Sequence, residues 1–149
     1  MKPARLPRRR VRGFTLVESM VVVAIVGVLS SIALPSMEGH VLRARRSDAL
    51  VSLMRAQLAE ERWLANSAAF GSLAEIGVAE RSSAGHYTLE LAAAPGGYRI
   101  TATATGAQTR DRACRVLRVQ MAGGDLTFAS GSDAEVANDA GPNRACWNR

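Results

Sequence analysis

The sequence predicts an α+β fold in which one long N-terminal helix packs on a four-stranded antiparallel sheet. Three observations predict this fold. Apolar residues recur at helical spacing from Phe14 to about Asn66. From His86 onward, apolar and polar residues alternate in short runs that read as two hairpins. Two cysteines, Cys114 and Cys146, enclose the C-terminal segment.

The first half of the predicted helix is apolar on all sides. Residues 14–34 contain one charged residue, Glu18, and these 21 residues would span about 31 Å as a helix, close to the hydrocarbon thickness of a bilayer. A secretory signal peptide fits poorly, because no small-x-small cleavage site clearly follows the run and the helical pattern continues. A plain membrane anchor explains the length of the run, but it explains neither Gly13-Phe14 nor Glu18.

The positive charge of the chain is concentrated before this segment. Residues 1–13 hold six of the 19 Lys and Arg and no acid, and the rest of the chain carries 13 Arg and 13 Asp and Glu. The net charge of +6 is therefore weak support for nucleic-acid binding. Basic residues beside a membrane segment stay on the cytoplasmic side, so the sequence after it is expected to be exported. Two cysteines in an oxidising compartment predict a disulfide, with a pair of buried thiols as the alternative.

The second half of the predicted helix is amphipathic, and a bend is expected near Pro35. Residues 67–85 read as a mixed loop with a short helical turn at residues 73–78. The first predicted hairpin turns at Pro95-Gly96-Gly97, and the second turns at Gly123-Gly124. A polar loop, residues 106–113, connects the hairpins. Residues 129–149 are expected to form a loose loop.

The start of the chain resembles the type IV pilins and their pseudopilin relatives. The features that carry the resemblance are the basic leader, Gly13-Phe14, Glu18 and the apolar run. Further along, several short motifs resemble minor pilins of the PilE type: Ala56-Gln57, Glu61-Arg62-Trp63, Tyr87-Thr88-Leu89, Tyr98-Arg99-Ile100-Thr101-Ala102, Asp111-Arg112-Ala113-Cys114 and Cys146-Trp147. Two features depart from the pattern of such pilins. Glu18-Ser19-Met20 stands where a Glu-Leu-Met run is frequent, and the loop at residues 67–85 is rich in Ala.

The resemblance implies a pilin fold with a disulfide-closed C-terminal loop and three parts. They are a leader at residues 1–13, a transmembrane assembly helix at residues 14–35 and an exported globular domain at residues 36–149. Prepilin peptidase would cut between Gly13 and Phe14, and Phe14 would be N-methylated. Glu18 would meet the N-terminal amine of a neighbouring subunit, and Pro35 would bend the helix.

The implied function is that of a minor subunit in pilus assembly. The implied partners are the peptidase, the inner-membrane assembly machinery and other major and minor pilins, and the protein would move from the inner membrane to the pilus. A major pilin, a type II secretion pseudopilin and a competence pilin that binds DNA are the alternatives. The residues that would bind DNA are the arginines around Cys114: Arg110, Arg112, Arg115 and Arg118.

The remaining motifs do not predict an enzyme, a cofactor or a metal site. His40 and His86 lack the spacing of a metal-binding motif. No nucleophile elbow, phosphate loop or Cys-x-x-Cys motif is present. The late segment contains four carboxylates and one amide that could offer oxygen ligands to calcium, but their spacing fits no EF-hand. These are Asp125, Asp133, Glu135, Asn138 and Asp139.

Overall fold

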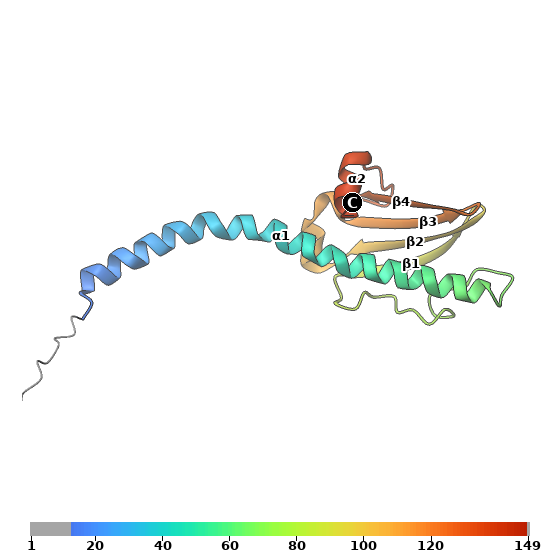
Figure 1. The fold of residues 1–149 in the computed structure, drawn as a ribbon, viewed down its shortest axis with the longest axis horizontal. Helices are drawn as coiled ribbons and strands as arrows, with labels where there is room; N and C mark the ends of the chain where they lie inside the picture. Colours follow the sequence, from blue (N-terminus) through green and yellow to red (C-terminus); the bar gives the residue numbers. More distant parts are fainter. Residues whose placement is uncertain (1–12, 149) are drawn as a thin grey trace, which may run out of the picture. The chain divides into compact units, whose positions relative to one another are not determined.

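The structure is a computed structural model that describes residues 13–148, apart from the side chains of residues 32–36. Helix α1 (Leu16–Leu64) is followed by strands β1 (Tyr87–Ala94), β2 (Gly97–Ala104), β3 (Val116–Ala122) and β4 (Asp125–Gly131) and by helix α2 (Ala140–Cys146) (Figure 1). Two 3-10 helices, η1 (Gly106–Arg110) and η2 (Arg112–Cys114), connect β2 to β3. The chain divides into an N-terminal unit, Met1–Met37, and a C-terminal unit, Glu38–Arg149, and each is described by itself. The predicted α+β fold is confirmed.

The N-terminal unit consists, in its described residues, of the first part of α1 and the three residues before it. Residues 13–29 are all exposed. The leader proposed for residues 1–13 lies outside the described residues except for Gly13, and the predicted span at residues 14–35 includes side chains that are not described. Within the part of the chain that the structure describes, no helix is long and apolar enough to cross a membrane.

The C-terminal unit is built on an antiparallel meander with the strand order β1-β2-β3-β4. The predicted turns close both hairpins. Gly123 and Gly124 have φ of 58° and 91°, as a two-residue loop between twisted strands requires. Gly97 pairs with Ala122, and a side chain there would collide with the backbone of Met121. Glycine at position 97 therefore allows β2 and β3 to approach closely.

The core lies between the sheet and the second part of α1. Ala49, Leu53 and Ala56 have no exposed surface, and their spacing of four and three residues places them on one face of the helix. From the sheet, alternate residues such as Ile100 and Leu117 point toward them and are also fully buried. Intervening residues occupy the opposite, outer face of the sheet, as the alternation predicts.

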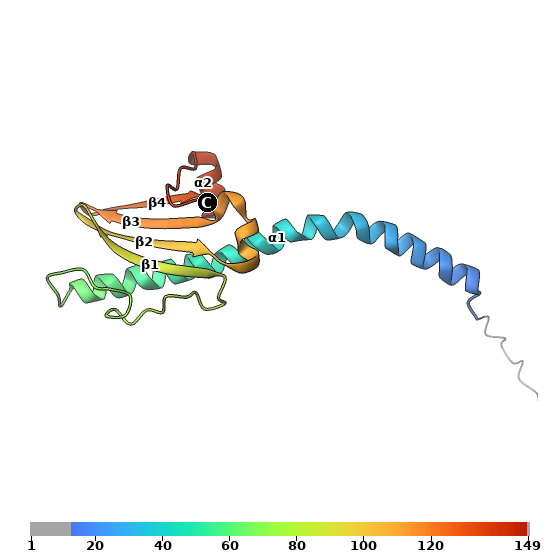
Figure 2. The ribbon, with the colours of Figure 1, turned by 180° about the vertical axis from the view of Figure 1, so that it is seen from behind.

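The segment between α1 and β1 runs beside both elements (Figure 2). It has no helix, but the turn predicted at residues 73–78 is present and closes with a hydrogen bond of 2.8 Å from the Val78 N–H to the Leu73 carbonyl oxygen. Arg81 forms an isolated bridge with Thr88 of β1.

The prediction of a loose loop at residues 129–149 was wrong. Residues 129–131 continue β4, and residues 140–146 form α2. The disulfide Cys114–Cys146, which the sequence predicted, joins α2 to η2. Trp147 is also buried and packs edge-to-face on Phe128, with ring centroids 4.9 Å apart. Because the disulfide and the indole ring both hold the segment against the sheet, a short helix forms in spite of an unfavourable local composition.

Candidate functional site

The apolar surface of α1 in the N-terminal unit is the first candidate site. Phe14, Leu16 and Met20 are 78%, 76% and 64% exposed. The exposure continues along the helix as far as Leu29. Contiguous apolar surfaces of this length are rare on soluble monomers and mark regions that another molecule covers.

Glu18 lies at the start of α1. Its backbone N–H donates to the Thr15 hydroxyl oxygen at 3.2 Å, and Thr15 is the residue just before the helix. The pattern Thr-x-x-Glu is that of a capping box, and a carboxylate in the first turn also favours the helix dipole. This local role was not predicted, although the spacing of Thr15 and Glu18 in the sequence signals it. The two roles are compatible, since the side chain of Glu18 is exposed.

The fold does not require glycine at position 13. A Cβ there would meet no atom within 4 Å, and the backbone is outside the left-handed region. Among the described residues, packing therefore gives no reason for Gly13. Pro35 lies within α1 but its side chain is not described, so the predicted bend stays a prediction.

A buried polar network joins α1 to the connection between β2 and β3. The Arg46 guanidinium donates to both oxygens of the Asp111 carboxylate, at 2.6 and 2.8 Å, and to the Ala145 carbonyl oxygen at 2.9 Å. The side chains of Arg46 and Asp111 are only 9% and 7% exposed. Gln108 donates to the Leu42 carbonyl oxygen at 3.0 Å and to the Tyr87 hydroxyl at 2.9 Å. The network fixes the η1–η2 segment and α2 on the first turns of α1 in the C-terminal unit.

Two tyrosines, Tyr87 and Tyr98, are buried in the C-terminal unit. Burial raises the pKa of Tyr87 to about 12, against the hydrogen bond from Gln108. Burial also raises the pKa of Tyr98 to about 12, and the nearby Glu61 and Glu60 add to the effect. Both phenols are neutral at physiological pH. Both rings pack in the core, and the Tyr87 hydroxyl also accepts the hydrogen bond from Gln108.

Two carboxylates of α1 hold the segment between α1 and β1. Burial works to raise the pKa of Asp48, but hydrogen bonds from Ser82, Ala84 and His86 outweigh it and lower the pKa. Glu60 accepts a hydrogen bond from the Gly71 N–H at 3.0 Å. Glu60 has no exposed surface, and this burial raises the pKa of its carboxyl group. Its second carboxylate oxygen has no partner among the described residues.

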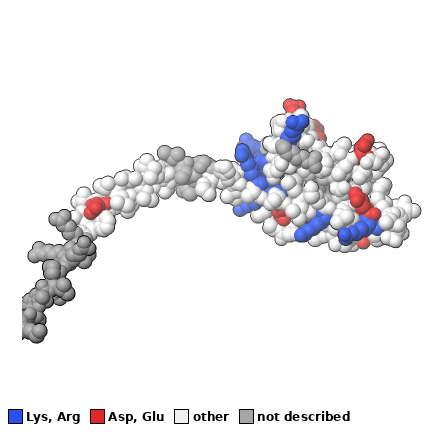
Figure 3. Space-filling view, viewed as in Figure 1, with Lys and Arg blue, Asp and Glu red and all other residues white. Residues whose placement is uncertain are grey.

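Arginines are distributed over several parts of the C-terminal unit (Figure 3). The structure divides the four arginines singled out around Cys114. Arg110 forms an exposed ion pair with Glu38 at 2.7 Å, and Arg112 is exposed on η2. Arg115 and Arg118 instead line a hollow on the outer face of the sheet.

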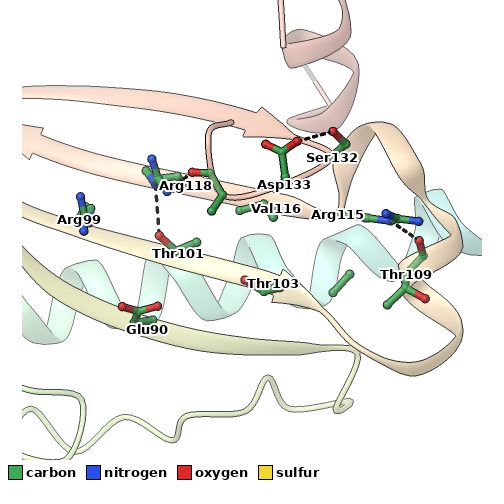
Figure 4. Close-up of a pocket in the computed structure, with 12 residues that line it drawn as sticks. Glu90, Arg99, Thr101, Thr103, Thr109, Arg115, Val116, Arg118, Ser132 and Asp133 are labelled. Atoms are coloured by element: carbon green, nitrogen blue, oxygen red, sulfur yellow. Dashed lines mark hydrogen bonds between the residues drawn. The ribbon is translucent and has the colours of Figure 1, made fainter. Parts of the chain in front are cut away.

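The hollow has a volume of about 690 Å³ and lies over β2 and β3 (Figure 4). Arg99 of β2 joins Arg115 and Arg118 in lining it, and sequence analysis did not include Arg99 among the candidate residues. Arg118 is fixed by donating to the Ala134 carbonyl oxygen at 2.7 Å and to the Thr101 hydroxyl at 3.3 Å. Arg115 donates to the Thr109 carbonyl oxygen at 2.6 Å.

The chemistry of the hollow is that of an anion-binding surface of mixed charge. Three arginines and three threonines line it, and two carboxylates, Glu90 and Asp133, partly balance the positive charge. Such a surface binds phosphates or carboxylates in a salt-dependent way. Among the described residues, no group of three or more His, Cys, Asp or Glu is placed to hold a metal ion.

Comparisons with known proteins agree with this architecture. Residues 35–118 match the family described as "Type IV minor pilin ComP, DNA uptake sequence receptor", and residues 8–34 match the prokaryotic N-terminal methylation motif. The type IV major pilin protein PilA of Myxococcus xanthus is 35% identical over 106 residues, which cover 70% of this chain and 43% of that protein.

Two shorter matches add to these. The fimbrial protein EcpC of Eikenella corrodens is 50% identical over 38 residues, covering 26% of this chain and 25% of that protein. The type IV major pilin protein PilE1 of Neisseria gonorrhoeae is 48% identical over 40 residues, covering 27% and 24%. The matched part of this chain thus spans less than half the length of each of these relatives.

Proposed function

We propose that this chain, which belongs to the ComP family of type IV minor pilins, is built into a pilus as a minor subunit through the N-terminal part of α1. The observation that carries the proposal is the family match over residues 35–118, more than half of the chain. The long helix, the four-stranded sheet and the Cys114–Cys146 disulfide support it. The role is structural, without a catalytic step.

Processing would begin at the Gly13–Phe14 bond. The methylation motif covers this bond, and the fold gives no other reason for glycine at position 13. Prepilin peptidase would remove residues 1–13, and Phe14 would become the N-methylated first residue of the mature protein. Replacing Gly13 with a bulky residue should therefore leave full-length precursor in the membrane, and normal processing would contradict the assignment.

Assembly would use the exposed apolar surface of residues 14–34 together with Glu18. In the inner membrane, lipid would cover this surface, and in the filament the helices of other pilins would replace the lipid. The Glu18 carboxylate and the amine of a neighbouring Phe14 would each lower the cost of placing the other in an apolar environment. Pro35 would supply the bend between the two parts of the helix.

Glu18→Gln tests this pairing against the capping role. The substitution keeps the backbone hydrogen bond to Thr15, because that bond uses the N–H of residue 18. It removes the charge, so we expect insertion to continue and incorporation into pili to fall at least tenfold. Thr15→Val is the matched control, since it removes the cap and leaves the charge. Equal incorporation of Glu18→Gln and the wild type would show that charge pairing is not needed.

The proposed role as a whole is tested by deleting the gene in a strain that cannot retract pili and counting surface pili. We expect a sharp fall in number, restored by the wild-type gene. Unchanged pilus number, together with absence of the protein from sheared pili, would contradict the proposal.

DNA binding through the outer face of the sheet is a second candidate function. The family description names a DNA uptake sequence receptor, and the observation that favours the role here is that Arg99, Arg115 and Arg118 line one hollow. Phosphate groups would bind the arginines, with the threonine hydroxyls as further donors. Glu90 and Asp133 limit the attraction. Because the arginines would bind phosphates electrostatically, affinity would fall with salt.

Mobility-shift assays of the full chain in detergent test this function. Arg99→Gln with Arg115→Gln should weaken binding to double-stranded DNA and lower the salt dependence by about one unit of slope per lost phosphate contact. Arg55→Gln with Arg62→Gln removes the same charge from α1, away from the hollow, and should bind like the wild type. Equal losses in both variants would indicate a general charge effect without a site.

A further inference from the structure

Four arginines surround the first turns of α1 in the C-terminal unit, and we call them the basic collar: Arg43, Arg45, Arg110 and Arg112. Three contacts place these arginines beside the same turns of α1. Glu38 pairs with Arg110 at 2.7 Å, Gln108 donates to the Leu42 carbonyl oxygen at 3.0 Å, and Arg46 holds Asp111 at 2.6 Å. The η1–η2 segment is therefore fixed against residues 38–46 of α1. Figure 3 shows blue side chains gathered where α1 enters the C-terminal unit.

Most of the positive charge of the basic collar is not neutralised within the described residues. Arg110 pairs with Glu38, but Arg43, Arg45 and Arg112 have neither a hydrogen bond nor an ion pair there. Asp111, next to Arg112 in sequence, is buried and already engaged by Arg46. Arg43 and Arg112 are exposed and Arg45 is half-buried, so three guanidinium groups are free to bind an anion.

The position of the basic collar in the sequence indicates which anion it meets. Arg43 lies nine residues after Leu34, which is about 13–14 Å along a helix. An arginine side chain can reach back over several ångströms of that distance, so a straight helix with Leu34 at the edge of the hydrocarbon would bring the Arg43 guanidinium within about one Debye length of the phosphate layer. Arginines this close to a membrane segment on its exported side run against the usual distribution of charge. A contact with anionic lipid would explain them.

We propose that the basic collar binds the headgroups of anionic phospholipids in the outer leaflet of the inner membrane while the subunit awaits assembly. The inference rests on the proposed function, because it needs α1 to be anchored in the membrane with the C-terminal unit outside. Each juxtamembrane cation near an anionic surface typically increases binding about fivefold. The contact orients the C-terminal unit on the bilayer, and it is lost when the subunit leaves the membrane for the filament.

The test measures which lipids surround the protein. The full chain is reconstituted into phosphatidylcholine bilayers with a trace of spin-labelled phosphatidylglycerol or spin-labelled phosphatidylcholine, and electron spin resonance gives the relative association of each label. At low salt we expect the wild type to prefer phosphatidylglycerol about fivefold, from one cation per lipid site. Because the attraction is electrostatic, 1 M salt should abolish the preference.

Two variants with equal loss of charge locate the effect. Arg43→Gln/Arg45→Gln/Arg112→Gln should lower the preference for phosphatidylglycerol, leaving only the part due to the leader. The variant should fold, because these three side chains make no internal bond among the described residues. Arg55→Gln/Arg62→Gln/Arg81→Gln removes three arginines that line a separate hollow beside the segment between α1 and β1, and it should keep the preference. Circular dichroism of both variants checks folding. Because the six basic residues of the leader also attract anionic lipid, the difference between the two variants is the result that locates the contact at the basic collar.

The contrary outcomes differ from one another. A chain that enters bilayers without preferring phosphatidylglycerol overturns the basic collar as a lipid site and leaves the pilin assignment intact. A chain that does not enter bilayers overturns the membrane-anchored precursor as well. If the collar variant keeps its lipid preference but loses binding to double-stranded DNA, the collar is a DNA contact and the lipid proposal is wrong.

Discussion

The buried ion pair between Arg46 and Asp111 should stabilise the C-terminal unit far more than the exposed pair between Arg110 and Glu38. The two pairs have nearly the same distance, 2.6 and 2.7 Å, and their members Asp111 and Arg110 are adjacent in sequence. They differ in burial: the side chains of the first pair are 9% and 7% exposed, and those of the second are 62% and 47% exposed. The buried pair also has more hydrogen bonds, since the Asp111 carboxylate accepts two from Arg46 and one from Gln108.

Asp111→Asn keeps the shape of the side chain and leaves the Arg46 guanidinium buried without a counter-charge. Breaking a buried pair in this way costs about 3–5 kcal/mol, and the amide oxygen that remains suggests the lower end of that range. Gln108 also loses a charged acceptor, at 3.2 Å from its amide nitrogen. Glu38→Gln removes the exposed pair, and such pairs contribute about 0–1 kcal/mol.

Urea denaturation of the oxidised full chain, followed by the fluorescence of Trp63 and the buried Trp147, measures both free energies. With a denaturant dependence of about 1–3 kcal/mol per molar urea, Asp111→Asn should lower the midpoint by about 1–3 M and Glu38→Gln by much less. Replacing both buried partners with apolar residues, as in Arg46→Met/Asp111→Leu, should recover much of the loss. Similar shifts for Asp111→Asn and Glu38→Gln would refute the argument that burial decides the effect.

Three further predictions concern other contacts of the C-terminal unit. Because burial raises the pKa of Glu60, the native state binds more protons than the unfolded state, and the free energy of unfolding should fall as pH rises above about 4.5. Urea midpoints between pH 4 and 7 measure this fall, and Glu60→Gln should make it smaller. The pKa of Asp48 is lowered, so ionised Asp48 stabilises the native state at neutral pH, and this stabilisation should disappear below about pH 4. Asp48→Asn should therefore lower the free energy of unfolding by about 1–3 kcal/mol at pH 7. Cys114→Ser/Cys146→Ser should lower the free energy of unfolding by about 2–4 kcal/mol, since the bond closes 32 residues of sequence, and an unchanged free energy would contradict this.

The regular elements were predictable because their patterns are local. Helix α1 was expected at residues 14–66 and is found at Leu16–Leu64, and both hairpins turn at the expected glycines. The pairing of Cys114 with Cys146 followed from their number and from the expected compartment. In each case, spacing along the chain determines the structure almost without reference to distant residues.

Helix α2 was not predictable, because tertiary contacts stabilise it. Its sequence contains Gly141 and Pro142 and has little helix propensity. The helix is held by the disulfide, by the hydrogen bond from Arg46 to Ala145 and by the packing of Trp147 on Phe128. None of these partners is near it in the sequence except Trp147, so periodicity carried no signal for it.

Two contacts divide the arginines between two surfaces. Asp111 turns inward between η1 and η2 and binds Arg46, which directs the neighbouring Arg110 and Arg112 to the level of α1. Beyond Cys114, which the disulfide anchors, Arg115 and Arg118 belong to the outer face of the sheet. A run of arginines that looks like one patch in the sequence is thus divided between the basic collar and the separate hollow. Loosening the Arg46–Asp111 pair should weaken lipid preference and anion binding together, whereas replacing arginines on either surface should affect only one.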